Sequence, residues 1–218
     1  MTRILPGETD IYALTDARLS LGRPLEEVAR ALLGAGVKIL QYREKKAKAG
    51  QMLEECRLLR RLTAEAGACF VVNDHIDIAL LVKADGVHVG QEDLPLACVR
   101  ELVGPEMLIG LSTHSPEQAR AAVVAGADYI GVGAVFPSST KPDAIPVTLA
   151  QLRDICAAVT IPAVAIGGIN WDNMDELAGS GVAGVAVSSA LFGAPNVESE
   201  ARSLWIQAEN LFCPSLDL

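Results

Sequence analysis

The sequence predicts an α/β protein folded as a single (β/α)8 (TIM) barrel. Short β-branched apolar runs alternate with stretches of helical period from one end of the 218-residue chain to the other. There are eight such runs, and their starts recur every ~25 residues, which suits a strand, a turn and a short helix. No linker, low-complexity tract or charge block interrupts the series, so we expect one domain over residues 1–218. An open, doubly wound sheet shares the local pattern and is the alternative fold.

The expected strands are short runs rich in valine, isoleucine and alanine that end at polar or glycine residues. They cover residues 11–15, 38–43, 69–73, 86–89, 108–112, 129–135, 163–167 and 184–188. Amphipathic helices are expected over residues 25–35, 52–66, 76–81, 116–125, 149–158, 173–179 and 197–212, with another after Pro95. Several helices are followed by a glycine at the position where a C-cap favours one, namely Gly36, Gly67, Gly126 and Gly181.

Composition and charge narrow the class of protein. The chain has 18 basic and 27 acidic side chains, a formal net charge of −9, and an aromatic content of 4%. Such a chain repels nucleic acid and anionic membranes and lacks the aromatic groups that stack on bases. No apolar stretch reaches the ~18 residues of a membrane span, the amino terminus lacks a secretory signal, and five cysteines without CxxC spacing fit reduced thiols.

These features define the expected location and partners. We expect a cytoplasmic protein that acts on small molecules, with neither nucleic acid nor membrane as a partner. The sequence leaves the oligomeric state open, a homo-oligomer included.

If the barrel is right, catalysis belongs at the carboxyl ends of the strands, and the second strand ends in a cationic motif. Strand alternation sends Gln41, Arg43 and Lys45 to one side and Tyr42 and Glu44 to the other. In an acidic protein, an arginine fork beside a lysine suits a diphosphate. A solvated turn with salt bridges to a helix is the alternative.

Carboxylates follow the third and fourth strands. Asn73 and Asp74 end one of them, and Asp93 follows the other. Two carboxylates at adjacent strand tips can share one hard cation, and Mg²⁺ favours such a sparse site completed by substrate phosphate oxygens and water. Simple capping of the following helices is the alternative, and the two roles are compatible.

The histidines and the fifth strand end are ambiguous. Ser112 and His114 follow that strand, whereas Ser115, directly before a proline, is expected to be an N-cap. A histidine without a paired carboxylate in the same motif is weak evidence for acid–base chemistry. For His88, inside a strand, we expect a satisfied interior side chain, and His75 stays unassigned.

A second anion site is predicted at the last three strands. The loop after the sixth strand offers three hydroxyls and one cation, and a polar surface loop is its alternative reading. Adjacent glycines follow the seventh strand and small residues follow the eighth, where such barrels commonly bind phosphate through backbone amides. Two phosphate groups would then face each other across the barrel mouth. The residues concerned are Ser138, Ser139, Thr140, Lys141, Gly168, Ser188 and Ser189.

Taken together, these residues resemble the thiamine phosphate synthase family over residues 11–191. A single motif would be unspecific, but many occur here in the right order. They are Gln41-Tyr42-Arg43-Glu44-Lys45, Asn73-Asp74, the runs 84–95 and 126–133, Ser112-Thr113-His114, Thr140-Lys141 and Ala165-Ile166-Gly167-Gly168-Ile169.

The resemblance implies a transferase. It would join 4-amino-2-methyl-5-hydroxymethylpyrimidine diphosphate to 4-methyl-5-(2-hydroxyethyl)thiazole phosphate, giving thiamine phosphate and pyrophosphate. The implied mechanism is dissociative and assisted by Mg²⁺, with the diphosphate leaving before the thiazole nitrogen attacks. It needs no protein nucleophile, and no Ser/His/Asp triad is recognisable in the sequence.

The resemblance also implies roles for individual residues. The pyrimidine diphosphate would be bound by Gln41, Tyr42, Arg43, Glu44, Lys45, Asn73, Ser112 and Lys141, of which Arg43, Lys45, Ser112 and Lys141 would be catalytic. Mg²⁺ would bind Asp74 and Asp93. The thiazole phosphate would be bound by Ser138, Ser139, Thr140, Gly168, Ser188 and Ser189.

Three positions differ from the family pattern. Ser188 replaces an aliphatic residue, Thr148 stands where glycine is usual, and His75 stands where arginine is frequent. These positions concern the thiazole side more than the diphosphate side, so the implied reaction class is unchanged.

Two other functions fit the same fold. A thiazole tautomerase would use His114 as acid or base and needs no diphosphate site. A noncatalytic sensor of thiazole phosphate would keep the second anion site and lose the metal. The presence of Arg43 and Lys45 together with Asp74 and Asp93 favours the synthase.

Overall fold

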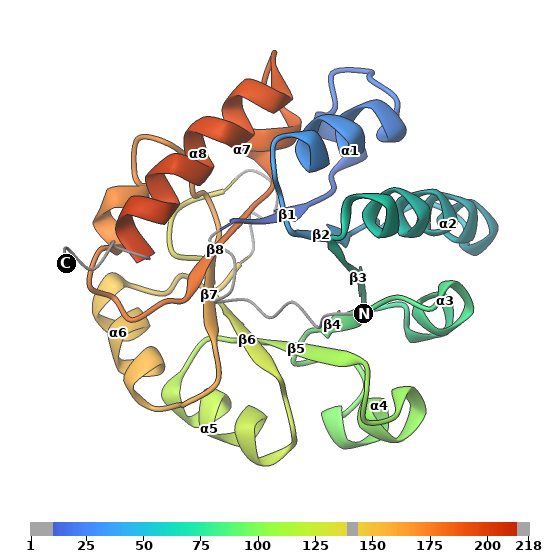
Figure 1. Ribbon diagram of the computed structural model, residues 1–218. Helices are drawn as coiled ribbons and strands as arrows, with labels where there is room; N and C mark the ends of the chain where they lie inside the picture. The colour runs from blue at the N-terminus through green and yellow to red at the C-terminus, as the bar shows by residue number, and fades with distance from the viewer. Residues whose placement is uncertain (1–10, 139–143, 213–218) are drawn as a thin grey trace.

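Eight parallel strands follow one another around a closed barrel in sequence order, and β8 pairs with β1 (Figure 1). The structure is a computed structural model that describes residues 11–138 and 144–212. Closure confirms the predicted (β/α)8 barrel and excludes the open sheet. The strands are β1 Ile11–Leu14, β2 Ile39–Tyr42, β3 Cys69–Asn73, β4 Gly86–Val89, β5 Leu108–Thr113, β6 Tyr129–Val132, β7 Ala163–Ile166 and β8 Gly184–Val187.

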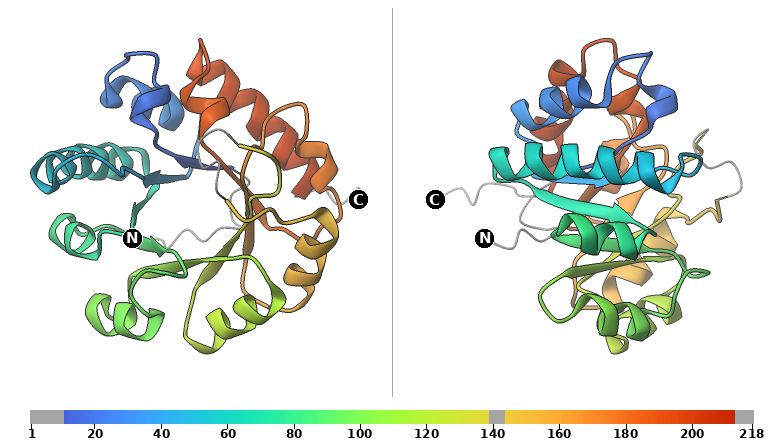
Figure 2. Two further views of the ribbon diagram at one scale, coloured as in Figure 1. Left: turned by 180° about the vertical axis from the view of Figure 1, so that it is seen from behind. Right: turned by 90° about the vertical axis from the view of Figure 1, so that its right-hand side faces the viewer.

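Helices form a ring outside the strands, as the views from the front, behind and side show (Figures 1 and 2). Within the described ranges, none of them is long and apolar enough to cross a membrane. The α-helices are α1 Leu25–Gly34, α2 Ala49–Ala66, α3 Ile76–Val82, α4 Leu96–Val103, α5 Pro116–Val124, α6 Leu149–Ala157, α7 Ser189–Phe192 and α8 Val197–Phe212, and two 3₁₀ helices are η1 Ala17–Leu19 and η2 Met174–Leu177.

One expected helix is much shorter in the structure. Residues 173–179 form only the 3₁₀ helix η2, in which Met174 and Leu177 are both buried, three residues apart, as one 3₁₀ turn requires. The Asn173 side chain accepts a hydrogen bond from Asn170 N and donates one to Gly168 O. The Asn173 side chain therefore holds the loop after β7. The helix does not extend beyond the single turn of η2.

Two other boundaries also moved. Helix α2 begins at Ala49, three residues before the expected start, and β6 ends at Val132, three residues before the expected end. Directly beyond β6, Ala134 exchanges backbone hydrogen bonds with Ile145 and Val147 of its own loop, and Val135 N then donates to Ile166 O of β7. The loop that carries part of the second anion site thus starts nearer the barrel than predicted.

Alternate strand residues fill two separate cores. Tyr12, Ile39 and Tyr129 belong to the cluster inside the barrel, whereas Ile11 and Leu40 belong to the larger cluster between strands and helices. Strand alternation produces this division, because successive side chains point to opposite faces. The same alternation decides which polar residues at the strand ends reach the barrel mouth.

At the amino-terminal ends of the barrel strands, two Asp–Arg pairs have the same arrangement, one before β4 and one before β6. Asp128 precedes β6, accepts a hydrogen bond from Ile109 N of β5 at 2.8 Å, and pairs with Arg100 of α4 at 2.7 Å. Asp85 precedes β4 and makes the equivalent contacts with Phe70 N of β3 and Arg60 of α2. Each pair fastens a helix to two neighbouring strands.

We expect Asp128→Ala to lower the free energy of unfolding by about 2–3 kcal/mol. The change removes a partly buried ion pair and leaves the Ile109 N–H without its acceptor. Urea denaturation measures the loss. Asp154→Ala, at an exposed position of α6, is the matched control and should change stability by less than about 0.5 kcal/mol. Equal stability of the two variants would show that the Asp128 pair has no structural role.

Candidate active site

A cavity of about 800 Å³ opens at the carboxyl ends of the strands, and residues at or just after all eight strand ends line it. This is the end of a (β/α)8 barrel at which active sites are found. The lining brings together eleven of the predicted residues that the structure describes. They are Gln41, Arg43, Lys45, Asn73, Asp74, Asp93, Ser112, Ser138, Gly168, Ser188 and Ser189.

Two predicted residues, Tyr42 and Glu44, are not part of the cavity lining. Tyr42 is 2% exposed and donates a hydrogen bond to Glu55 of α2 at 2.5 Å, on the outer side of the barrel. Glu44 accepts hydrogen bonds from the backbone N–H groups of Lys45 and Lys46. Strand alternation alone also places Tyr42 and Glu44 on the side of the β2 end that faces away from the cavity. Ser139, Thr140 and Lys141 lie outside the described residues.

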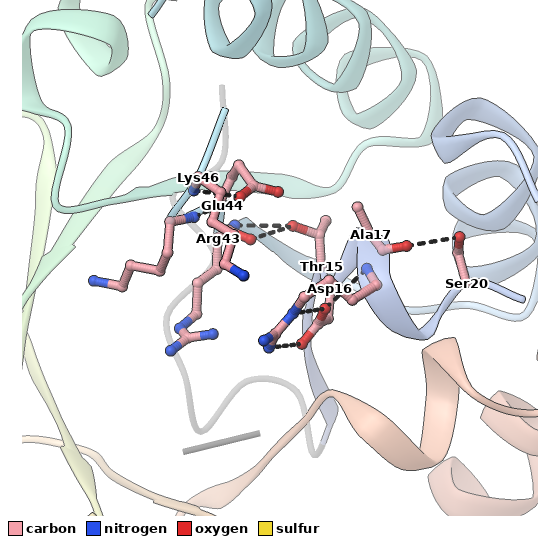
Figure 3. Close-up of polar contacts among 9 residues, drawn as sticks. Thr15, Asp16, Ala17, Ser20, Arg43, Glu44 and Lys46 are labelled. Carbon is pink, nitrogen blue, oxygen red and sulfur yellow. Dashed lines mark hydrogen bonds and ion pairs between the residues drawn. The ribbon is translucent and has the colours of Figure 1, made fainter. Parts of the chain in front are cut away.

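Thr15, which the sequence analysis missed, holds the backbone of Arg43. Its hydroxyl accepts a hydrogen bond from Arg43 N at 2.8 Å and donates one to Arg43 O at 3.3 Å (Figure 3). Its own N–H donates to Gln41 O at 2.9 Å. Beside it, buried Asp16 pairs with Arg18. A polar residue directly after β1 was the available signal, because every strand end faces this cavity.

Asp74, Glu92 and Asp93 line the cavity just beyond the ends of β3 and β4, and Asp74 and Asp93 are the predicted metal ligands. Asp74 follows β3 in a left-handed conformation, with φ of 61°, and forms an ion pair with Lys45. Asp93 Oδ2 accepts a hydrogen bond from Gly90 N at 2.7 Å. In the described part of the chain no three His, Cys, Asp or Glu side chains gather as a metal site. Asp74 and Asp93 nevertheless suit Mg²⁺, which commonly takes one or two carboxylates together with substrate oxygens.

Five side chains form a hydrogen-bonded row inside the barrel, called here the interior chain. Gln41 Nε2 donates to Tyr12 Oη at 2.6 Å, and the Tyr12 and Tyr129 hydroxyl oxygens lie 2.8 Å apart. Tyr129 Oη lies 3.1 Å from His88 Nδ1, and His88 Nε2 lies 3.0 Å from Ser112 Oγ. His88 is therefore the satisfied interior histidine that the sequence analysis expected, and it also lines the cavity.

Burial controls the protonation of the interior chain. It lowers the pKa of His88 to about 4, a shift that the charge of Asp93 partly opposes. Burial also raises the pKa of Tyr12 and of Tyr129 above the usual tyrosine range. All three groups are therefore neutral at neutral pH. The two tyrosines were missed because an aromatic residue inside a strand is normally core.

Glycines on β5 and β6 make room for this row. A Cβ on Gly110 would overlap Tyr129 and His88 Nδ1, and one on Gly131 would lie 3.1 Å from His88 Cε1. Neither glycine has a positive φ, so neither is needed for backbone conformation. Their absent side chains provide the space that the two rings occupy.

Gly110→Ala should therefore lower the free energy of unfolding by about 1–3 kcal/mol, because the new methyl group displaces a packed ring. Gly34→Ala is the matched control, since a Cβ at the end of α1 meets nothing within 4 Å. Chemical denaturation of both variants measures the difference. A Gly110→Ala protein as stable as Gly34→Ala would contradict the close packing.

The remaining strand ends form the other side of the cavity. A Cβ on Gly168 would overlap the Pro137 carbonyl, so glycine at this position lets the loops after β6 and β7 touch. Ser188 and Ser189 lie where β8 passes into α7. His114 Nδ1 donates to Gly133 O at 2.6 Å, which fixes its ring at the cavity wall.

Two of the departures from the family pattern have a visible structural setting. Thr148 is the N-cap of α6, where its hydroxyl accepts from Gln151 N at 3.2 Å and the Gln151 side chain accepts from Thr148 N. This capping box explains why threonine serves well where glycine is usual. His75 is the N-cap residue of α3 and makes no side-chain cap hydrogen bond.

A (β/α)8 barrel whose mouth gathers cations, carboxylates and small residues has the layout of an enzyme for phosphorylated small molecules. Residues 11–191 match the family described as thiamine monophosphate synthase. The chain belongs to this family of transferases.

Curated relatives and one solved structure agree with this assignment. The chain is 50% identical to a thiamine-phosphate synthase of Lawsonia intracellularis, over 94% of this chain and 96% of that protein. It is 50% identical to one of Pelotomaculum thermopropionicum, over 90% and 91%. The structure of a thiamine phosphate pyrophosphorylase from Pyrococcus furiosus superposes with a TM-score of 0.87 at 42% identity, covering 94% of this chain and 98% of that one.

Proposed function

We propose that this chain joins 4-amino-2-methyl-5-hydroxymethylpyrimidine diphosphate to 4-methyl-5-(2-hydroxyethyl)thiazole phosphate, forming thiamine phosphate and releasing pyrophosphate. The observation that carries the proposal is the convergence of Arg43, Lys45, Asp74 and Asp93 on one cavity in a member of this family. The net charge of −9 makes this local gathering of cations informative, since the protein as a whole repels anions.

The diphosphate would lie at the ends of β2 to β4. Arg43 offers a planar fork and Lys45 a point charge, both of which suit phosphate oxygens. Asp74 and Asp93 would hold Mg²⁺, and Lys141 would reach the same diphosphate. When bound, the ion supplies positive charge to a departing diphosphate.

The pyrimidine ring would lie over the interior chain. Gln41 Oε1 is buried and has no hydrogen-bond partner among the described residues, so it is a ready acceptor for the amino group of the substrate. Asn73 and Ser112 line the same side of the cavity and would complete the ring contacts.

The thiazole phosphate would lie at the ends of β6 to β8. Small residues let a phosphate approach the backbone there, and hydroxyls add donors. The proposed ligands are Ser138, Ser139, Thr140, Gly168, Ser188 and Ser189.

This arrangement suits a dissociative transfer. The protein's work is to stabilise departing negative charge with Arg43 and Lys45 and to hold the two rings in contact. The neutral interior chain places no competing charge beneath the pyrimidine. A protein nucleophile is not required.

We propose a cytoplasmic enzyme in which residues 1–218 form one catalytic domain. Fractionation of cells tests the location. Sedimentation of the purified chain tests whether it forms a homo-oligomer.

The reaction is tested by incubating both substrates with the protein, with Mg²⁺ or with EDTA. Thiamine phosphate and pyrophosphate should appear in equal amounts and only with Mg²⁺. A thiazole tautomerase would instead convert its thiazole substrate without the pyrimidine and without pyrophosphate. A sensor would bind thiazole phosphate and make no product. Either result would overturn the proposal.

A further inference from the structure

The interior chain has a free acceptor at one end and a hydroxyl at the other. Gln41 Oε1 is buried and unpartnered in the described structure, and both Gln41 and Ser112 line the cavity. Between these two ends lie three groups that are satisfied by one another. The row crosses the barrel from β2 to β5 and joins residues up to 117 positions apart in sequence.

The direction of the hydrogen bonds follows from the first donor. Gln41 Nε2 can only donate, so Tyr12 accepts from it and its own hydrogen goes to Tyr129 Oη. Tyr129 then has one hydrogen left, which goes to His88 Nδ1. A neutral imidazole that accepts at Nδ1 carries its proton on Nε2, so His88 donates to Ser112 Oγ.

The last hydrogen, on Ser112 Oγ, then has no acceptor within the chain of five and is available to the cavity. Only one other assignment of donors and acceptors lets every inner group both donate and accept. In that assignment the direction of every hydrogen bond in the row is reversed. In that setting Gln41 would present its amide N–H groups, Ser112 would present lone pairs, and His88 would carry its proton on Nδ1. The two ends of the row are therefore coupled through three neutral groups.

We propose that the interior chain is a directional relay that presents a matched acceptor at Gln41 Oε1 and donor at Ser112 Oγ to one ligand, with His88 held in its Nε2–H tautomer. Tyr12, Tyr129 and His88 are thus positioning residues. With the pyrimidine assigned above, a point that rests on the proposed function, the relay selects a ring that offers an amino group at one end and an acceptor at the other.

The surroundings support a fixed setting. Gly110 and Gly131 leave space that the two rings fill, so His88 packs against the backbone of both glycines and Tyr129 against that of Gly110. A broken bond would leave a buried polar atom unpaired, which costs more than a typical hydrogen bond gains. Burial also keeps the three inner groups uncharged at neutral pH. Rearrangement therefore has to involve the whole row.

The test is ¹⁵N NMR of the histidine rings in the ligand-free protein at neutral pH. His88 should show the Nε2–H tautomer, and a scalar coupling across the hydrogen bond should join the Tyr129 hydroxyl proton to His88 Nδ1. His114 is an internal reference of opposite tautomer, because its Nδ1 donates to the carbonyl of Gly133. An Nδ1–H tautomer at His88, or rapid averaging of both, would overturn the proposal without any variant.

A second experiment changes Gln41 and measures the tautomer of His88 toward the other end of the row. In Gln41→Glu, an ionised carboxylate can only accept, so His88 should switch to Nδ1–H although three hydrogen bonds separate the two side chains. The ¹³C shift of the new carboxyl reports its ionisation, and the switch is expected of the ionised form, because a protonated carboxyl can both donate and accept. Nε2–H persisting beside an ionised carboxylate would contradict the relay.

Two further variants locate the coupling. Tyr129→Phe cuts the row, so adding Gln41→Glu to it should no longer switch the tautomer. Tyr42→Phe is the matched control, since Tyr42 bonds to Glu55 outside the barrel, and there the switch should survive. The NMR needs no substrate, so an Nε2–H result without turnover would reject the proposed reaction alone, and turnover with the wrong tautomer would reject the relay alone.

Discussion

Asp93→Ala should release pyrophosphate from the pyrimidine substrate at least ~10²-fold more slowly than the wild-type protein at saturating Mg²⁺. The change removes one of the two cavity-lining carboxylates that we propose hold Mg²⁺ beside the diphosphate. Electrostatic stabilisation of a leaving group commonly carries this much of an enzyme's rate. The fold should survive, because Asp93 lies in a loop beyond the end of β4. Steady-state pyrophosphate release against Mg²⁺ concentration measures the effect.

Asp93 also accepts a hydrogen bond from Gly90 N, so the alanine variant disturbs the loop as well as the charge. Asp93→Asn separates the two effects, because its amide oxygen can still accept from Gly90 while the negative charge is gone. The asparagine variant should be impaired nearly as much as the alanine variant. Turnover restored by asparagine would assign Asp93 to loop support and reject the metal role.

Arg43→Lys should lower kcat/KM for the pyrimidine diphosphate about tenfold to a hundredfold, although the positive charge is kept. Arginine presents a planar fork to two oxygens, and lysine presents one point charge on a flexible chain. Thr15 fixes the Arg43 backbone through two hydrogen bonds. The Arg43 side chain, which carries the guanidinium, therefore extends from a defined backbone position. Initial rates across substrate concentration measure the loss.

Arg61→Lys, at an exposed position of α2, is the matched control and should leave the kinetics unchanged. The affinity for free pyrophosphate gives a second readout, because the product should lose the same contact as the substrate. An Arg43→Lys enzyme with wild-type kcat/KM and wild-type pyrophosphate affinity would remove Arg43 from the diphosphate site.

The barrel was predictable because its signal is local and repeated. Each strand–helix unit carries its own apolar pattern, and polar residues at the strand ends have few reasons to be polar other than the site. Alternation also sorted Gln41 and Arg43 from Tyr42 and Glu44, and the structure places the first two at the cavity and the second two outside its lining. The family resemblance assigned all four residues to substrate binding, although strand alternation had already separated Tyr42 and Glu44 from the other two.

The interior chain was not predictable from the sequence, for a physical reason. Tyr12, His88 and Tyr129 come from β1, β4 and β6, and only closure of the barrel brings them together. Each alone looks like an ordinary core residue. Likewise, η2 is short because Asn173 bonds to the neighbouring loop rather than starting a helix, and helical periodicity does not report such contacts.

The central claim is that two anion sites face each other across one cavity, with the diphosphate at the Arg43 side. A crystal structure with pyrophosphate, thiazole phosphate and Mn²⁺ in place of Mg²⁺ tests it most directly. Pyrophosphate should contact Arg43 and Lys45, the anomalous signal of Mn²⁺ should lie on Asp74 and Asp93, and the thiazole phosphate should lie near Gly168 and Ser188. Pyrophosphate at Gly168, or Mn²⁺ away from both carboxylates, would contradict the account.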